Sequence, residues 1–314
     1  MSAPLPACTQ PTMYFIGVTT AGSSIMKVFP KWSEVLGLGA KLRGYDALLH
    51  APATDYQNIV DHIKADPLVR GALVTTHKID LLAATRDRFE YLDPYALLCD
   101  EISSISKVND RLEGHAKDPI SSGLAWQAFV PSSHFEQTGG EVLCFGAGGA
   151  SIAISVYLSG LSDSANRPRK LIAVDILPER LDALRAILTK AGNTLDVEYV
   201  VNADVRVNDA LLERLPPGSV VINGTGMGKD RPGSPISNNA VFPDSGLVWE
   251  LNYRGELDFL KHARRQAFDR QLHIEDGWMY FLFGWSQVVA QVFHLAVTPE
   301  LFHALDVAAS TFRT

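Results

Sequence analysis

The chain has 314 residues, of which 46% are hydrophobic and 20% are charged. This length is enough for two domains that each bury a core, and the composition is that of an ordinary soluble globular protein. A formal net charge of -7, without a long basic run, argues against nucleic acid or an anionic membrane surface as the main partner.

Cysteine usage and the amino terminus predict a cytoplasmic protein. Cys8, Cys99 and Cys144 are odd in number, far apart and without the spacing of metal ligands, so we expect inert thiols and no metal site. The first residues lack the basic and apolar regions of a secretory signal, and no segment has the roughly 18 uninterrupted apolar residues of a membrane span.

Apolar runs and helical patterns alternate in the first third of the chain, which predicts an α/β domain on a largely parallel sheet. Strands are expected at residues 14–18, 41–48 and 72–75, and helices at 24–38, at 55–64 and after His77. Residues 105–115 resemble two short strands around a polar turn. Asp118 before Pro119 is a strong helix start, with Asp at the N-cap.

A second α/β unit begins after the loop at residues 131–140. The apolar run 142–145 enters the glycine turn 146–150, a helix follows at 151–158, and a second strand at 171–175 ends in Asp175. Glycines let the backbone approach a pyrophosphate, the following helix attracts its charge, and an acid after the second strand accepts hydrogen bonds from a ribose. Asp175 therefore favours NAD over NADP.

Plainer interpretations of this unit remain open. A glycine turn between strand and helix often serves packing alone. Asp175 is also placed to cap the helix that Pro178 begins, and capping and ribose binding can coexist.

We therefore expect a two-domain α/β protein: an N-terminal α/β substrate domain and a doubly wound, Rossmann-type dinucleotide-binding domain. The substrate domain spans 1–130 and is completed by C-terminal helices at 277–314, and the NAD-binding domain spans 131–276. Further strands are expected at 196–201, 219–223 and 247–251. An apolar stretch at 278–295 predicts one long buried helix that packs back on the first domain.

Several segments in order resemble the shikimate and quinate dehydrogenase family over nearly the whole chain. They are the glycine-to-serine loop at 17–24, Val-Thr-Thr-His-Lys at 74–78, Val-Asn-Asp at 108–110, Gly-His-Ala-Lys-Asp at 114–118, the glycine turn at 146–150, Asn-Gly-Thr-Gly-Met-Gly at 223–228, Glu-Leu-Asn-Tyr at 250–253 and Asp-Gly-Trp-Met at 276–279.

The resemblance implies that Lys78 and Asp118 form the catalytic pair. Oxidation of a secondary alcohol needs a group that takes the hydroxyl proton as the hydride leaves, and a lysine positioned by a carboxylate can serve. It also implies substrate contacts from Ser23, Thr75, Asn109, Tyr253 and Gln287. Cofactor contacts are implied for Gly146, Ala147, Gly148, Gly149, Ala150, Asp175, Asn223, Thr225 and Met227. Taken alone, Lys78 also fits a solvated lysine and Asp118 a simple N-cap.

Departures from the family pattern cluster where substrate would lie. Ile25 replaces a carboxylate-binding serine, Ala116-Lys117 replaces Asn-Thr before the catalytic aspartate, and Lys107 replaces an alanine. An ungapped count brings the family's late glutamine to Gly284, with Gln287 three residues further on nearly the same helix face. Loss of designed hydrogen bonds weakens the case for shikimate itself as substrate.

The leading hypothesis is an NAD-dependent dehydrogenase of a hydroxylated cyclic carboxylic acid, with a small-molecule substrate and a homodimer suggested by the family. A nucleotide-binding sensor or regulator that has lost turnover on the same fold is the alternative. A methylene-tetrahydrofolate type of dehydrogenase fits less well, because the segments around Asn109 and Asp118 match the shikimate type.

Overall fold

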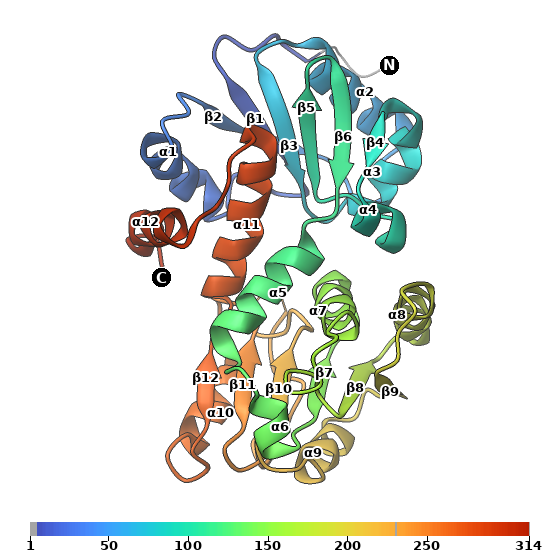
Figure 1. Ribbon diagram of the computed structural model, residues 1–314, viewed down its shortest axis with the longest axis vertical. Helices are drawn as coiled ribbons and strands as arrows, with labels where there is room; N and C mark the ends of the chain where they lie inside the picture. Colours follow the sequence, from blue (N-terminus) through green and yellow to red (C-terminus); the bar gives the residue numbers. More distant parts are fainter. Residues whose placement is uncertain (1–4, 230, 314) are drawn as a thin grey trace. The chain divides into compact units, whose positions relative to one another are not determined.

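The computed structural model describes residues 5–229 and 231–313 and divides into two compact α/β units (Figure 1). The first unit holds the chain up to Asp118 together with Gly284–Arg313, and the second holds Pro119–Phe283. The divisions fall inside helices α5 (Asp118–Phe129) and α11 (Trp278–Phe293) rather than at residues 130 and 276. The first boundary lies at the start of α5 because this helix belongs to the core of the second unit: the Trp126 and Phe129 rings pack 6.2 and 5.6 Å from the Trp249 ring.

The first unit is built on a sheet with strand order β2-β1-β3-β5-β6-β4. Its elements are β1 (Thr12–Gly17), α1 (Ile25–Val35), β2 (Lys41–Asp46), α2 (Ala53–Ala65), β3 (Val69–Val74), α3 (Lys78–Thr85), the 3-10 turn η1 (Arg86–Arg88), β4 (Tyr91–Leu92), α4 (Pro94–Cys99), β5 (Ser104–Val108), β6 (Arg111–His115) and α12 (Pro299–Ser310). β1 pairs in parallel with β2 and β3, but β5 is antiparallel to β3 and β6. The parallel arrangement predicted for the first three strands is confirmed, and β4 also pairs in parallel with β6. The two pairings of β5 make the whole sheet mixed, because the predicted strand pair at 105–115 is an antiparallel hairpin closed by a two-residue turn.

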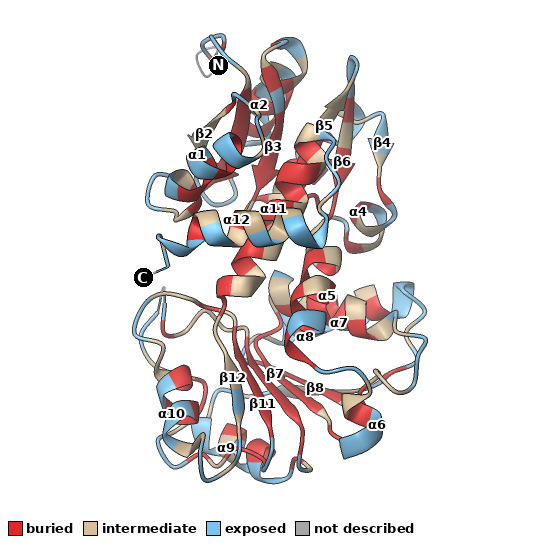
Figure 2. Cartoon of the chain, turned by 60° about the vertical axis from the view of Figure 1, so that its left-hand side comes forward, coloured by how far each residue is buried: buried red, intermediate tan, exposed pale blue. Residues whose placement is uncertain are grey.

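Both faces of this sheet are covered, as the burial of its central strands shows (Figure 2). Alternation along β1 sends Tyr14 and Ile16 into the core on the side of α2 and α3, while Phe15 meets Trp285 of α11 at a ring distance of 5.0 Å. The later part of the long apolar helix thus packs on the first unit.

The second unit has the strand order β12-β11-β10-β7-β8-β9, with every pairing parallel. Its elements are α6 (His134–Thr138), β7 (Val142–Phe145), α7 (Gly149–Ser159), β8 (Lys170–Asp175), α8 (Pro178–Lys190), β9 (Asp196–Val201), α9 (Val205–Glu213), β10 (Val220–Asn223), β11 (Leu247–Glu250), α10 (Asp258–Gln266) and β12 (His273–Glu275), besides most of α5 and the start of α11. This is the order of a doubly wound dinucleotide-binding sheet, which confirms the predicted fold class.

Candidate functional site

In the first unit, the loops after β1 and β3 lie at the same edge of the sheet. These neighbouring strands are parallel, so their carboxyl ends meet there, where ligands bind in open α/β sheets. Thr75 donates its backbone N–H to the Ile16 carbonyl at 3.0 Å, and Ser23 follows β1 in a turn closed by its N–H to the Thr20 carbonyl at 3.0 Å. A side chain at Gly17 would approach Thr75 Oγ1 to 3.0 Å, so glycine lets the two strand ends come close.

Lys78 and Asp118 form an ion pair in the first unit. Lys78 is the first residue of α3 and Asp118 the first of α5, and the Lys78 ammonium donates to Asp118 Oδ2. Their side chains are 20% and 19% exposed, so the pair is largely shielded yet reachable. The fold therefore joins two residues that are forty positions apart in sequence.

Glu101 is a third ionisable group next to this pair, and sequence reasoning missed it. Glu101 follows α4, whose C-cap Asp100 has a left-handed backbone with φ of 54°. Ile102, the residue after Glu101, donates its N–H to the Lys78 carbonyl at 3.4 Å. Burial raises the pKa of Glu101, the Lys78 charge lowers it, and the Asp118 charge raises it further. No motif indicates this residue, because only the fold brings it next to Lys78 and Asp118.

Asn109 does not lie with Lys78 and Asp118, contrary to the expectation. It is at the turn of the β5–β6 hairpin with φ of 56°, whereas Asp118 follows the opposite end of β6. Five residues of strand separate the two ends, which is roughly 16 Å. The hairpin register thus places Asn109 away from the Lys78–Asp118 pair, and Asn109 lines another cavity with Arg70 and Lys107.

Gln287 and Lys117 line one cavity of about 290 Å³ in the first unit. Gln287 lies on α11, and Gln291, one turn further on, accepts a hydrogen bond from the Lys117 ammonium at 3.1 Å. Gly284, at the position matched to the family's glutamine, offers no side chain. Ile25 is fully buried and supplies no polar contact where the family has serine.

In the second unit, the glycine turn has the geometry that its sequence predicts. Gly146 has φ of 91° and donates its N–H to the Val174 carbonyl at 2.7 Å, and an added Cβ would lie 2.7 Å from the Gly224 carbonyl oxygen. An added Cβ at Gly148 or Gly149 would meet nothing within 4 Å, and α7 begins without a side-chain cap. The turn leaves open space beside a helix N-terminus.

Asp175 ties this turn to the end of β8. Its side chain is 4% exposed, and its two oxygens accept the N–H groups of Ala147 at 2.7 Å and Leu177 at 2.9 Å. Leu177, not Asp175, is the N-cap of α8. Asp175 also lines a cavity of about 130 Å³ together with Gly146, Thr225 and Met227. Arg180 lies at the same cavity, with Nη1 3.7 Å from Asp175 Oδ2.

A buried polar network supports the loop after β10. Asn223 donates to Glu250 Oε2 at 2.7 Å, and Thr225 Oγ1 donates to Asn223 Oδ1 at 2.7 Å. Burial raises the pKa of Glu250 to about 7, against the hydrogen bonds from Asn252 and Asn223 that lower it. Tyr253 follows this network, and its ring packs on those of Trp278 and Phe281.

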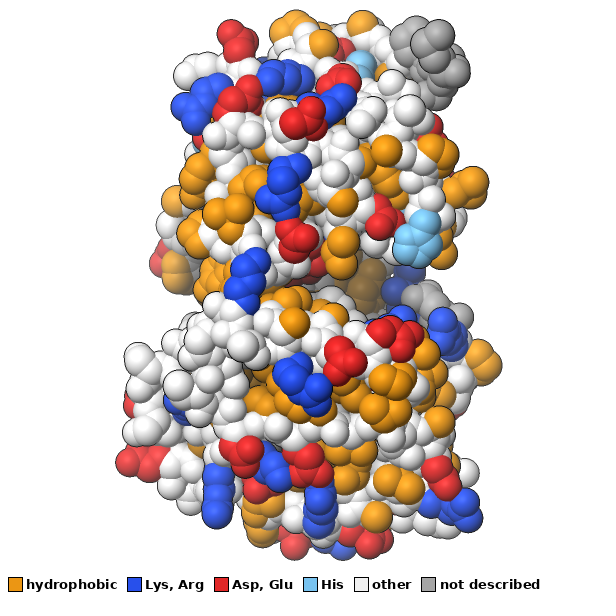
Figure 3. All heavy atoms as spheres, turned by 90° about the vertical axis from the view of Figure 1, so that its right-hand side faces the viewer, with side chains coloured by type: hydrophobic (Ala, Val, Ile, Leu, Met, Phe, Trp, Pro, Cys, Tyr) orange, Lys and Arg blue, Asp and Glu red, His pale blue; other side chains and the backbone are white. Residues whose placement is uncertain are grey.

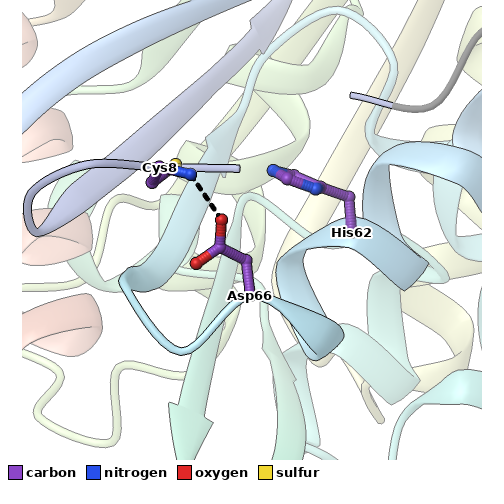
Figure 4. A group of neighbouring side chains, drawn as sticks. All are labelled: Cys8, His62 and Asp66. Carbon is purple, nitrogen blue, oxygen red and sulfur yellow. Dashed lines mark hydrogen bonds between the residues drawn. The ribbon is translucent and has the colours of Figure 1, made fainter. Parts of the chain in front are cut away.

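Among the described residues, one group of side chains could hold a metal ion, and none of its members belongs to the two sites above. Ligand atoms of Cys8, His62 and Asp66 lie within 4.8 Å of one another (Figure 4). Asp66 accepts N–H groups from Cys8 at 2.7 Å and from Leu68 at 2.9 Å, and His62 Nε2 is 3.0 Å from the Tyr14 hydroxyl. These bonds hold the amino-terminal segment to the end of α2.

Helix hydrophobicity and surface charge were also compared with the sequence-based expectations. Within residues 5–229 and 231–313, no helix has both the length and the apolar content to cross a membrane. On the face seen in Figure 3, lysine and arginine side chains alternate with acidic ones instead of gathering in a basic patch.

Comparison with known proteins shows which proteins this chain resembles. No family model matches the chain. It is 29% identical to shikimate dehydrogenase (NADP(+)) of Lactococcus lactis subsp. cremoris over 179 residues, which cover 56% of this chain and 58% of that protein. The corresponding enzyme of Streptococcus gordonii is also 29% identical over 181 residues, with 56% and 58% covered. The chain thus spans little more than half the length of these curated relatives.

Among solved structures, quinate dehydrogenase from Corynebacterium glutamicum in complex with NAD aligns with a TM-score of 0.74 and 18% identity, over 96% of this chain and 98% of that one. The curated relatives confirm the resemblance to shikimate dehydrogenases, and the solved structures show that the chain shares the fold of shikimate and quinate dehydrogenases. The fold of these dehydrogenases is also shared by 5-ketofructose reductase of Gluconobacter sp. strain CHM43, with a TM-score of 0.71 and 16% identity over 96% and 98% of the two chains.

Proposed function

We propose that the protein is a dehydrogenase that transfers a hydride between a hydroxylated cyclic carboxylic acid and a nicotinamide cofactor. The observation that carries this proposal is the shielded ion pair of Lys78 and Asp118. Because α3 and α5 hold the two groups together, a substrate hydroxyl beside them meets a proton acceptor and a carboxylate that orients it.

In the oxidation direction, the neutral Lys78 amine takes the hydroxyl proton while the C–H bond breaks with its electron pair, and a ketone forms. The nicotinamide, when bound, supplies the hydride acceptor. Asp118 stabilises the ammonium that results, so the proton remains on Lys78 Nζ until solvent or the reverse reaction removes it. In the reduction direction, Lys78 returns that proton to the carbonyl oxygen.

The proposed substrate contacts are Ser23, Thr75, Gln287 and Tyr253, with Asn109 left out because of the hairpin register. Ser23 and Thr75 supply hydroxyls at the sheet edge that bears Lys78, and Gln287 supplies an amide that both donates and accepts. Tyr253 belongs to the second unit and is retained on the family resemblance alone.

The proposed cofactor contacts are the turn from Gly146 to Ala150, then Asp175, Asn223, Thr225 and Met227. The residues fit a pyrophosphate, because the space at Gly148 and Gly149 is open beside the uncapped start of α7. We propose NAD as the preferred cofactor, because a 2′-phosphate would lie near the buried Asp175 carboxylate. The curated relatives are named as NADP(+) enzymes, so this preference needs its own measurement.

A panel of cyclic hydroxy acids with NAD and with NADP, monitored by nicotinamide absorbance, tests the proposal. We expect turnover with at least one acid and a lower KM for NAD than for NADP. Retained nucleotide binding without turnover across the panel would favour the sensor, while tighter NADP binding would overturn the cofactor preference alone. Light scattering on the same sample tests the homodimer, and cell fractionation tests the cytoplasmic location.

A further inference from the structure

Lys117 is a partly buried cation whose direct side-chain partner is neutral. It precedes α5, its backbone N–H donates to Ser103 Oγ at 2.8 Å, and its ammonium donates to the Gln291 side-chain oxygen at 3.1 Å. Burial lowers the pKa of Lys117, because the charged form loses solvation. An amide dipole compensates a buried positive charge less well than an anion does.

The acid that acts on this charge is already engaged elsewhere. The Asp93 carboxylate raises the pKa of Lys117 through space, but no ion pair joins the two among the described residues. Asp93 Oδ1 accepts the N–H groups of Ala96 at 2.6 Å and Ala116 at 3.2 Å, and Oδ2 is 3.5 Å from His115 Nδ1. Among residues 5–229 and 231–313, therefore, no carboxylate forms an ion pair with the Lys117 ammonium.

Lys107 provides the contrast. It is also partly buried with a lowered pKa, but its ammonium donates to the carbonyls of Lys64 at 3.2 Å and Asp66 at 2.9 Å. These carbonyls belong to the end of α2, where a cation is favourable. Lys107 thus has a structural role, whereas the surroundings of Lys117 do not explain its charge.

The Lys117 ammonium borders the cavity of about 290 Å³, whose lining also includes Gln287, Gln291 and His294 and contains no acidic residue. We propose that this cavity, defined by Lys117, Gln287 and Gln291, is a binding site for a carboxylate or similar small anion. Lys117 would supply the charge, and the two amides would supply hydrogen-bond donors once Gln291 turns its N–H₂ group toward the ligand.

Two sources can supply this anion. One is the carboxylate of the substrate itself, in which case the inference rests on the proposed function and Lys117 offsets the serine hydroxyl absent at Ile25. The other is a separate small anion that binds whether or not the protein turns over a substrate. Both share the same recognition chemistry, and the experiment distinguishes them.

Binding is measured by calorimetry on the full chain, with and without NAD, using quinate, shikimate, their methyl esters, acetate and inorganic phosphate. The variants are Lys117→Met, Lys117→Arg and, as the matched control, Lys107→Met. For the ligands that bind the unmodified protein, we expect Lys117→Met to weaken affinity by about 10-fold to 100-fold. Lys117→Arg should retain most of that affinity, and Lys107→Met should leave it unchanged. Circular dichroism melts check that each variant is folded.

Gln291→Glu gives a second test that keeps the lysine. The new carboxylate would pair with the Lys117 ammonium and compete with the ligand, so binding should fall although no cation is removed. Loss confined to the free acids, with the methyl esters unaffected, identifies the substrate carboxylate. Loss for phosphate or acetate alone identifies a separate anion.

Unchanged affinity for every anion in both Lys117→Met and Gln291→Glu overturns the inference. Failure of the proposed function is seen separately, because it removes turnover with all acids in the unmodified protein while Lys117-dependent anion binding persists.

Discussion

The glycine turn of the second unit is made of consecutive residues, whereas the ion pair of the first unit joins side chains forty positions apart. In the turn, the proposed cofactor contacts depend on backbone dihedrals and N–H groups, which short-range sequence determines. In the first unit, the proposed proton transfer depends on which side chains the strand register brings to one sheet edge. A substitution should therefore act through the backbone in one unit and through side-chain chemistry in the other.

Removal of the lysine should give the largest effect on turnover. We expect Lys78→Ala to lower kcat by a factor on the order of 10³ or more, because the variant lacks the amine proposed to take the hydroxyl proton. The dissociation constant for NAD, measured by fluorescence titration, should change less than about twofold, since the glycine turn belongs to the other unit. Near-normal turnover would remove Lys78 from the mechanism.

Two glycines of one turn should separate folding from binding. Gly146→Ala places a Cβ 2.7 Å from the Gly224 carbonyl oxygen at a residue with φ of 91°, so we expect a loss of several kcal/mol in unfolding free energy. Gly148→Ala meets no atom within 4 Å, so the protein should melt normally. Its NAD affinity should nevertheless fall by about tenfold or more, because the methyl group would occupy the space proposed for pyrophosphate. Equal affinity of Gly148→Ala and the unmodified protein would count against that placement.

The same division explains what sequence could predict. The strand–turn–helix–strand unit around Gly146 and Asp175 is readable because each step depends on neighbouring residues. Asn109 was misplaced because a Val-Asn match carries no information on where a hairpin turns, and the β5–β6 register decides which end approaches Asp118. Glu101 had no signal, since its surroundings come from Lys78 and Asp118, which lie far along the chain. β12, of only three residues, is too short for a periodic pattern.

Cofactor choice tests the backbone side of the comparison. We expect Asp175→Asn with Ile176→Arg to move the ratio of NADP to NAD affinity toward NADP by about 10-fold to 100-fold, because a like charge is removed and a cation added. Asp175 also accepts the Ala147 and Leu177 N–H groups, so the double variant should melt at a lower temperature.

Ile176→Arg alone is the matched control for that variant. Ile176 is 56% exposed, so its replacement should leave stability unchanged. If the single variant changes the preference as much as the double one, Asp175 does not set the cofactor choice.

Glu101→Gln tests the side-chain network of the first unit with a smaller effect. The folded-state pKa of Glu101 is raised, so its contribution to stability is full below the ordinary glutamate pKa and is lost as pH rises through the folded value. The variant should therefore match the unmodified protein near pH 4 and exceed it in unfolding free energy near pH 8, as urea melts would show. The variant should change kcat less than about tenfold, because Lys78 and Asp118 are both retained. Equal unfolding free energies for the two proteins at pH 8 would separate Glu101 from the pair.

The smallest effect on catalytic efficiency is expected from substitution of Asn109, whereas substitution of Ser23 should weaken substrate binding. Asn109→Ala should change kcat/KM less than about twofold, because the hairpin places this residue roughly 16 Å from the end of the strand that leads to Asp118. Its φ of 56° makes alanine unfavourable, so a loss of about 1 kcal/mol in unfolding free energy is expected, and Asn109→Gly should avoid that loss. Ser23→Ala should instead raise KM for the acid about tenfold with little change in stability, since its hydroxyl is proposed to contact substrate. If Asn109→Ala lowers kcat/KM while Asn109→Gly melts normally and is equally impaired, the amide contacts substrate after all, and the match of Val108-Asn109 to the family motif outweighs the register seen in the sheet.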